Sequence, residues 1–498
     1  MNLEANLDVA QLAAEFRSIL ISQSSPISTD LFFDSTYTTY DTSVGLEFHA
    51  DDFANFESMG DECVHKLRNI AQRMIPARNL SQCVEIYKNV RKPFIKSILQ
   101  GSGTEKLSIN EIRSRRVAWV AVEAKIRLWI RVANVCFKVL FVREKRVCEQ
   151  IFDENVGNDV FVKIVKDPAL HLINFAEAIS TSRRSQERLF LVLDLYKTLF
   201  GVLPDLESMF ECSSSELVRV RANDTLALLA DMVRGILEEF ENAVLGEVLQ
   251  HPVPGGGLQG STIKVMNYMK TMGFHEQTLV RLIISKPSID PRYNVDLTSM
   301  DMEFAELDAQ TPLAIHFRWI IVIHLFNLKG KSKQYEDVAL AHLYMMNNVH
   351  YFFQKIVGSE ELTKIIGDGY VTKLAIRVQE EAYEYLRPTW EKVLHCLGNE
   401  GPSFSGVSKY ALRQKIKSFN ATFEEVHRTQ ATWIVQDLQL REELRISFLE
   451  KLILAYKSFL RPFESFIDSE KHPEPIVKYS AEDLQTAVFE FFNGHPVS

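Results

Sequence analysis

The stretch WVAVEAKIRLWIRVANVCFKVL, residues 119–140, decides the fold class. Within it, bulky or apolar residues recur at spacings of three and four, the pattern that buries one side of an α-helix against its neighbours. The residues of this stripe are Trp119, Val122, Ile126, Trp129, Ala133, Cys136 and Leu140. The stretch therefore predicts an amphipathic helix within a helical bundle.

The same helix is predicted to begin well before the stripe. Ser108 and Glu111 have the spacing of a capping box, and no Gly or Pro follows until Gly157. A helix of roughly forty residues would measure about 60 Å, since each residue adds about 1.5 Å. Such a length favours a rod or a bundle over an ordinary globular domain.

Further helix starts follow downstream. Ser213 and Glu216 suggest a second capping box, Thr311 and Pro312 a cap with its first-turn proline, and Ser480 with Asp483 the start of a last helix. The helix after Ser213 has its own apolar stripe: Leu226, Leu229, Val233, Leu237, Phe240 and Val244. No clear two-residue alternation between hairpin turns appears. We expect an all-α protein, an elongated rod of stacked helical bundles similar to an α-solenoid.

Composition narrows the class of protein. The chain has 498 residues, 46% of them hydrophobic and 24% charged, which indicates a soluble folded protein of several packed units. The net charge of −9 opposes nonspecific binding to nucleic acid or to anionic lipid, so any such binding must come from a local patch. No apolar run is long enough to span a membrane, and the amino terminus lacks the pattern of a secretory signal.

Cysteine usage suggests a reducing compartment, because no two cysteines have CxxC spacing. The six are Cys63, Cys83, Cys136, Cys148, Cys212 and Cys396. We therefore expect a cytoplasmic protein without a disulfide framework or a zinc module.

Segments rich in helix breakers suggest the domain boundaries. These are His251–Gly260 and Gly398–Gly406, while residues 290–308 hold six acids and one base and are typical of an acidic loop. We predict four helical bundles, spanning residues 1–156, 157–260, 261–397 and 398–498.

No motif of catalysis or cofactor binding stands out. Gly255–Gly257 lacks the Lys-Ser or Lys-Thr of a P-loop, and Gly367–Tyr370 is better explained as a turn between helices. Two histidine pairs, His316 with His324 and His342 with His350, lie eight apart, which favours core or surface histidines over metal ligands. His395 and Cys396 are neighbours in sequence and point about 100° apart in a helix. No catalytic residue, metal or cofactor is therefore predicted.

Several longer segments resemble the plant branch of the exocyst complex's seventy-kilodalton subunit family. They occur in the family's order and together cover nearly the whole chain. The densest match runs from SGVSKYALRQKIKSFNATFEEVHRTQATWIVQDLQLREELRISFLEKLILAYKSFL at residues 405–460 to IVKYSAEDLQTAVFEFF at residues 476–492. The others are FAEAISTSRRSQERLFLVLDLY (175–196), FENAV (240–244), PVPGGG (252–257), VMNYM (265–269) and MMNNVHYFFQKI (345–356).

This resemblance implies a non-enzymatic subunit that tethers post-Golgi secretory vesicles to the plasma membrane in exocytosis. It implies other exocyst subunits, small GTPases and a phosphoinositide-containing membrane as partners, and peripheral association of a cytoplasmic protein with the plasma membrane. The alternative is a specialised plant trafficking or immunity adaptor that binds protein ligands such as pathogen effectors. Family members also carry a coiled-coil-prone region before the point where this sequence begins, so either the sequence starts at a truncation boundary or this member is short.

The resemblance also makes the last predicted bundle, residues 398–498, the candidate membrane-facing end and supplies candidate lipid-binding residues. In the family, basic residues near the carboxy terminus contact phosphoinositide headgroups, and the matching positions here are Arg413, Lys415, Lys417 and Lys478. Other members can have a base three residues before the lysine of VKY, where this chain has Pro475. Residues 401–498 hold 12 Lys and Arg against 13 Asp and Glu, so the alternative is a set of ordinary solvated helix residues.

Overall fold

The computed structural model describes residues 2–24, 59–75, 79–101, 119–247, 251, 253–287, 311–398, 409–461 and 477–495. The chain divides into two compact units, Met1–Phe240 (unit 1) and Glu241–Ser498 (unit 2). Within the described ranges every regular element is a helix, apart from one isolated antiparallel bridge between Ile434 and Asn493. The predicted all-α class is confirmed, and the division into four bundles stays a prediction.

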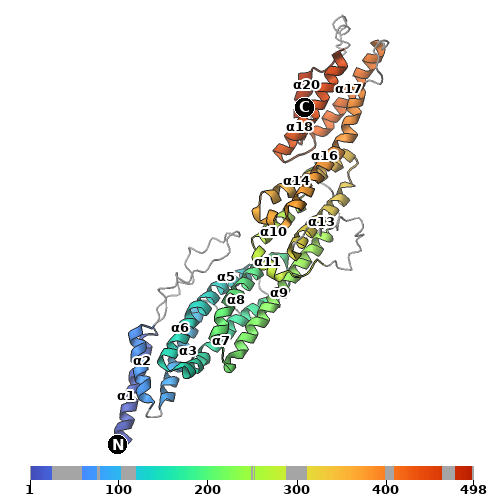
Figure 1. The fold of residues 1–498 in the computed structure, drawn as a ribbon. Coiled ribbons are helices and arrows are strands. Elements are labelled where there is room, and N and C mark those ends of the chain that lie inside the picture. The colour runs from blue at the N-terminus through green and yellow to red at the C-terminus, as the bar shows by residue number, and fades with distance from the viewer. Residues whose placement is uncertain are drawn as a thin grey trace. The chain divides into compact units, whose positions relative to one another are not determined.

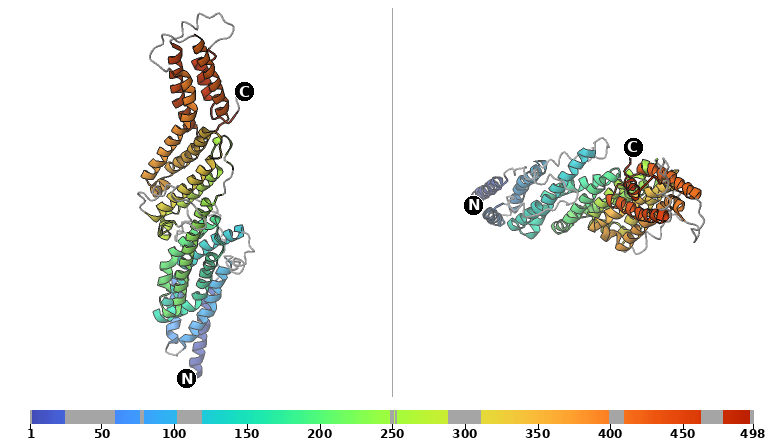
Figure 2. Two further views of the ribbon diagram at one scale, coloured as in Figure 1. Left: turned by 90° about the vertical axis from the view of Figure 1, so that its right-hand side faces the viewer. Right: turned by 90° about the horizontal axis from the view of Figure 1, so that it is seen from above.

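Unit 1 is a bundle in which α5 packs on α8, α6 on α7, and α3 on both α1 and α7 (Figure 1). Figure 2 shows from two further sides that its helices lie lengthwise against one another. Its elements are α1 (Asn2–Ser22), α2 (Asp61–Met74), α3 (Leu80–Gly101), α5 (Trp119–Val135), the π-helix η5 (Cys136–Leu140), α6 (Phe141–Ile151), α7 (Glu154–Ser180), η6 (Gln186–Arg188), α8 (Leu189–Met209), η7 (Ser213–Ser215) and α9 (Glu216–Leu245), which crosses the unit boundary.

From Val122 onward, the apolar stripe of the decisive stretch faces the core of unit 1, as predicted. From Val122 to Leu140, every stripe residue is at most 7% exposed. The helix continues through η5 into α6 but ends at Ile151, six residues before the predicted end at Gly157. Asp153 causes this earlier end: its φ is 96°, and its carboxylate accepts a hydrogen bond from the Val156 amide as the cap of α7.

Gly157 instead belongs to the first turn of α7. A Cβ at this position would lie 2.8 Å from the Cys148 carbonyl oxygen, so the glycine allows α6 and α7 to approach closely. The predicted cap at Ser108 and Glu111 lies outside the described residues.

Unit 2 is a second set of packed helices. Its closest partners are α14 and α16, and α17 and α18 both pack on α16. Its elements are η8 (Pro254–Gly256), α10 (Gly260–Gly273), α11 (Glu276–Leu282), α13 (Pro312–Ser332), α14 (Val338–Val357), α15 (Glu360–Ile366), α16 (Asp368–Leu397), α17 (Lys409–Ala431), α18 (Leu438–Leu460) and α20 (Ala481–Phe489).

Two of the three downstream caps form as predicted. The Thr311 hydroxyl accepts from the Ala314 amide with Pro312 in the first turn, and Ser480 and Asp483 make a reciprocal capping box. The Ser213–Glu216 box does not form, because a 3₁₀ turn occupies residues 213–215 and the Ser215 hydroxyl donates to the Cys212 carbonyl. Helix α9 still begins at Glu216.

The stripe predicted for α9 is also largely inside the protein. Leu226 is half-buried, and the other members of the stripe are buried: Leu229, Val233, Leu237, Phe240 and Val244.

The residues after α20 close the end of α17. The Phe492 amide donates to the Gln430 carbonyl at 3.0 Å, and the Gly494 amide donates to the Ala431 carbonyl at 3.0 Å. Arg445 of α18 donates to the Asn493 side chain at 3.0 Å. This turn therefore satisfies carbonyl groups that a helix end leaves without partners.

Candidate functional site

Three of the four predicted lipid-binding residues lie in the first turns of α17. Arg413 and Lys417 are four residues apart and share one face of the helix, since four residues advance about 400° around its axis. Arg413 is half-buried and Lys417 is exposed. Lys415 lies about 200° from Arg413, and its ammonium donates to the Gly398 carbonyl at 3.1 Å. Lys415 is therefore separated from the other two.

The fourth residue, Lys478, lies just before α20 and pairs with α17. Its Nζ is 2.7 Å from Oε1 of Glu424, and the Tyr479 hydroxyl donates to the same oxygen at 3.2 Å. The hydrogen bond from Lys478 lowers the pKa of Glu424 and raises the pKa of Lys478. Glu424 is seven residues after Lys417, two turns along the same face of α17 and about 10 Å away along the axis.

The structure thus brings Arg413, Lys417 and Lys478 to one face of α17. Aromatic packing fixes the segment before α20 there: the Tyr479 ring lies 5.6 Å from the Phe423 ring, and the Tyr456 hydroxyl donates to the Tyr479 carbonyl at 2.7 Å. The face also carries Glu424, which balances one of the three cations. Its net charge is consequently modest.

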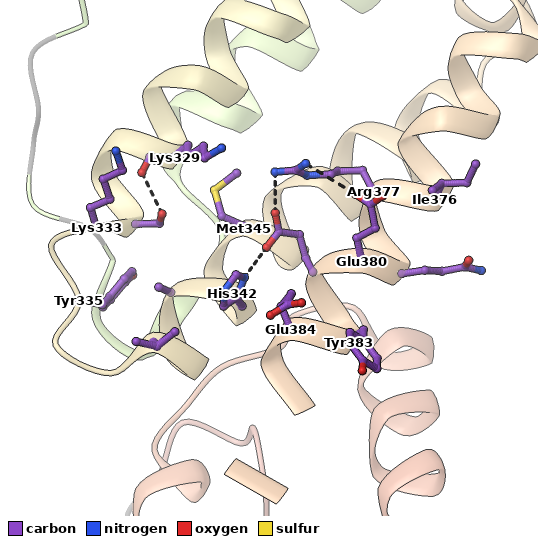
Figure 3. A pocket seen from close by; sticks show the side chains of 15 residues that line it. Lys329, Lys333, Tyr335, His342, Met345, Ile376, Arg377, Glu380, Tyr383 and Glu384 are labelled. Atoms are coloured by element: carbon purple, nitrogen blue, oxygen red, sulfur yellow. Dashed lines mark hydrogen bonds and ion pairs between the residues drawn. The ribbon is translucent and has the colours of Figure 1, made fainter. Parts of the chain in front are cut away.

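A second candidate site is a groove of about 920 Å³ formed by the end of α13, the start of α14 and the middle of α16 (Figure 3). We call it the α13–α14–α16 groove. Its lining combines apolar, aromatic and charged side chains. Nothing in the sequence pattern indicated it, because residues 329–345 and 376–384 meet only through the packing of α14 on α16.

The floor of the groove carries a buried carboxylate. Glu381, 6% exposed, accepts from Nδ1 of His342 at 2.7 Å and from Arg377 at 3.0 Å (Figure 3). The two donors come from α14 and α16. This network holds α14 against α16 along the floor of the groove.

The glycine-rich segment Gly255–Gly257, which was compared with a P-loop in the sequence, is a structural loop. Gly255 and Gly256 have φ values of 72° and 73°, a left-handed conformation that only glycine adopts readily. The Asn347 amide donates to the Gly256 carbonyl at 2.7 Å and to the Ile434 carbonyl at 2.8 Å. Asn348 accepts from the Gln259 amide at 3.0 Å. The segments PVPGGG, MMNNVH and TWIVQ therefore meet in one buried junction.

The paired histidines have structural partners. His316 contacts Glu241 at 2.5 Å and the Ser285 carbonyl at 3.0 Å, and His324 contacts the Thr262 hydroxyl at 3.0 Å.

His350 lies 3.4 Å from the Asp437 carboxylate. Among the described residues, no group of three His, Cys, Asp or Glu side chains is placed to hold a metal ion. Cys396 is half-buried, and its thiol donates to the Lys392 carbonyl one turn earlier.

Gly367 forms the turn between α15 and α16 that the sequence predicted, with a φ of 85°. Arg318 fixes this turn by donating to the Ile366 carbonyl at 2.9 Å through Nε. The predicted acidic loop at 290–308 lies outside the described residues, as does nearly all of the segment 398–406. None of the helices that the structure describes is both long and apolar enough to cross a membrane.

The family model and the similar proteins from plants all indicate the same protein family. Residues 127–489 match the family model for the carboxy-terminal region of Exo70, a component of the exocyst complex. The chain is 31% identical to exocyst complex component EXO70A1 of Arabidopsis thaliana, covering 97% of this chain and 77% of that protein. It is also 31% identical to EXO70B1 of the same plant, covering 88% of this chain and 68% of the relative.

Solved structures agree on the fold. The crystal structure of the S. cerevisiae exocyst component Exo70p superposes with a TM-score of 0.60 at 13% identity, covering 97% of this chain and 88% of the yeast chain. A second yeast Exo70 structure gives a TM-score of 0.58 and covers 98% of this chain and 87% of its own. On the family match and these plant relatives, the chain belongs to the Exo70 family of exocyst subunits.

Proposed function

We propose that this chain tethers post-Golgi secretory vesicles to the plasma membrane as the Exo70-type subunit of an exocyst. Exo70 proteins are non-enzymatic exocyst subunits, so the function of this chain rests on binding. The observation that carries the proposal is similarity to exocyst components over 97% of the chain. Other exocyst subunits are the expected partners, and small GTPases are proposed as further ones.

The proposed membrane contact uses Arg413, Lys415, Lys417 and Lys478. Supporting this is the common face of α17 on which Arg413, Lys417 and Lys478 lie. Each cation near an anionic leaflet contributes about 1 kcal/mol before salt screening. Because Glu424 already pairs with Lys478, a headgroup must displace that carboxylate or share the lysine with it. We therefore expect weak, reversible docking.

Liposome sedimentation tests this contact. The full chain is mixed with phosphatidylcholine vesicles with or without phosphatidylinositol bisphosphate, and compared with a variant in which Arg413, Lys415, Lys417 and Lys478 are changed to Glu. The expected result is pelleting that depends on phosphoinositide and is lost in the variant. A matched control reverses four exposed lysines elsewhere, Lys96, Lys163, Lys197 and Lys264, with the same change in net charge.

Equal pelleting of the wild type and the first variant would remove the lipid proposal, and so would equal loss in the control. A Glu424→Gln variant sharpens the test. It frees Lys478 from its ion pair, so it should increase phosphoinositide-dependent pelleting if Lys478 reaches the membrane. If the pelleting does not increase, Lys478 is not part of the lipid contact.

The alternative, a trafficking or immunity adaptor for protein ligands, is favoured by one observation: the α13–α14–α16 groove, which is open to a protein ligand. An affinity pull-down of the tagged full chain from plant cells distinguishes the two functions. Copurification of the other exocyst subunits supports tethering. Capture of protein ligands without exocyst subunits, together with no liposome binding, supports the adaptor.

A further inference from the structure

The α13–α14–α16 groove is lined by residues of unit 2 between Lys329 and Glu384, all of which precede α17 in the sequence. None of its lining residues belongs to the proposed lipid contact. An inference about the groove is therefore independent of the membrane proposal.

The groove has the features of a preformed binding site. Its volume of about 920 Å³ falls in the range of ligand-binding clefts. Tyr335, which lines one side, is held in place because its hydroxyl donates to the Val253 carbonyl at 2.5 Å and its ring packs 5.5 Å from the Tyr344 ring. The His342–Glu381–Arg377 network fixes the floor. Little conformational freedom remains to be lost when a ligand binds.

Apolar side chains are exposed around this fixed floor. Val338 is 60% exposed, Ile376 49% and Tyr383 64%, although all three line the groove. From α14, the half-buried Ala341 and the buried Met345, 5% exposed, add a small apolar surface. An aromatic or aliphatic side chain of a partner would cover this surface.

The charges of the groove are segregated. Lys329 and Lys333 come from the end of α13, and within the described part of the chain neither lies within ion-pair distance of a carboxylate. Glu380 and Glu384 come from α16, where they face Arg377 at 3.6 Å and Arg387 at 3.0 Å. In Figure 3, Lys333 and Tyr335 lie on one side of His342, and Glu380 and Tyr383 lie on the other.

We propose that the α13–α14–α16 groove binds a peptide segment of a partner protein, with an apolar or aromatic side chain at its centre and opposite charges at its two ends. The central side chain packs on Met345 and Ala341. An acidic residue faces Lys329 and Lys333, and a basic residue faces the glutamates of α16. A nucleic acid or an anionic bilayer fits poorly, because the glutamates of the lining match its lysines and arginine in number and leave no net positive charge to attract a polyanion.

Selection from a display library of short random peptides on the immobilised full chain tests this proposal. We expect enriched peptides that carry an apolar centre between an acidic and a basic end. The affinities of synthetic versions are then measured by fluorescence anisotropy against the wild type and a Lys329→Glu/Lys333→Glu variant. Both lysines are exposed, so the variant should fold normally. The expected loss is about tenfold in affinity, through repulsion of the acidic end.

A compensating change makes the test specific. Peptides whose acidic end is replaced by lysine should regain affinity for the Lys329→Glu/Lys333→Glu variant. As a control, a Lys96→Glu/Lys197→Glu variant, which reverses two exposed lysines of unit 1, should bind the original peptides as the wild type does. The proposal is overturned if no peptide class is enriched, or if the enriched peptides bind the groove variant as tightly as the wild type.

Discussion

Two regions of the molecule, one in each unit, satisfy buried polar groups in different ways. Unit 1 contains a buried ion pair between helices: Arg91 of α3 donates to Glu144 of α6 at 2.6 Å, and the Tyr87 hydroxyl donates to the same carboxylate at 2.9 Å. Unit 2 contains a junction of two loop segments, in which the backbone carbonyls of Gly256 and Ile434 accept from the side-chain amide of Asn347. The ion pair joins two helices that already satisfy their own backbone, whereas the asparagine supplies bonds that a loop cannot make for itself.

This comparison explains why the segments PVPGGG and MMNNVH stand out in the sequence. Neither segment is accompanied by the residues that bind phosphate in a P-loop. The two segments instead hydrogen-bond to each other, through the Asn347 amide and the Gly256 carbonyl. Glycines give the loop its left-handed turns, and asparagines replace the missing helix hydrogen bonds. A conspicuous motif in a helical protein can therefore reflect a buried loop rather than a ligand site.

The largest expected effect comes from breaking the ion pair of unit 1. Glu144→Gln leaves the Arg91 guanidinium buried, 7% exposed, without a counter-charge. The expected loss in the free energy of unfolding of unit 1 is about 3–5 kcal/mol. Hydrogen exchange of α3 and α6, followed by mass spectrometry, measures it. The double variant Arg91→Met/Glu144→Leu should recover most of the loss, and equal destabilisation in both would contradict the explanation.

The matching test in unit 2 is Asn347→Ala. It removes hydrogen bonds to the Gly256 and Ile434 carbonyls, with an expected cost of about 2 kcal/mol. Faster hydrogen exchange should appear in α14 and in residues 431–436. Asn134→Ala in unit 1 is the control, because the hydrogen bond of the Asn134 amide within the described residues stays in its own helix, to the Ile130 carbonyl at 2.9 Å. If both variants lost the same free energy of unfolding, the hydrogen bonds of Asn347 across the junction would contribute no more than a bond within one helix.

A third test uses pH. Burial, with the nearby Lys331 ammonium, lowers the pKa of His324 to about 3, while the unfolded value is about 6.5. Between these values the unfolded chain binds a proton that the folded chain does not. Stability from this group is therefore present above pH 6.5 and is lost as the pH falls, by about 1.4 kcal/mol per unit.

Urea unfolding of the wild type and of His324→Gln at pH 7 and pH 5.5 measures this dependence. The glutamine variant can keep a hydrogen bond to Thr262 without titrating, so its stability should fall less on acidification. An identical fall in both proteins would show that His324 does not contribute.

The smallest expected effect concerns glycine. Gly201 lies in α8 of unit 1, where an added Cβ would come no closer than 4.0 Å to Lys138 Nζ, so Gly201→Ala should stabilise by about 0.5–1 kcal/mol. The same change at Gly255 should destabilise unit 2, because φ is 72° and the Cβ would lie 2.9 Å from the Thr432 carbonyl. Thermal unfolding of the two variants compares the signs. If both variants were stabilised, or both destabilised, the conformational difference between the two glycine positions would not explain their stabilities.

Much of the fold could be predicted from local patterns. The stripe from Val122 to Leu140 and the caps at Thr311 and Ser480 were sufficient for the helices they describe, because helical burial and capping depend on residues close in sequence. The break after Ile151 was missed, although Asp153 followed by Glu154 is a helix-start signal. The 3₁₀ turn at Ser213–Ser215 and the π-helix have no such signal.

The arrangement of the candidate lipid-binding residues could be predicted only in part from the sequence. The common face of Arg413 and Lys417 follows from helical spacing, but the pairing of Lys478 with Glu424 joins residues 54 positions apart and depends on how the segment before α20 packs. The junction around Asn347 joins residues about 90 positions apart for the same kind of reason. Tertiary contacts of this kind produce no periodic pattern in the sequence.

The π-helix Cys136–Leu140 has a consequence for how the chain tolerates length changes. One extra residue in a helix turns everything after it by about 100°. This offset lets a single continuous helix present α5 to α8 and α6 to α7 without bending at a proline. Deletion of Lys138 alone would leave a regular helix and every apolar side chain of the segment in place, yet it would turn the whole of α6 toward the wrong neighbour.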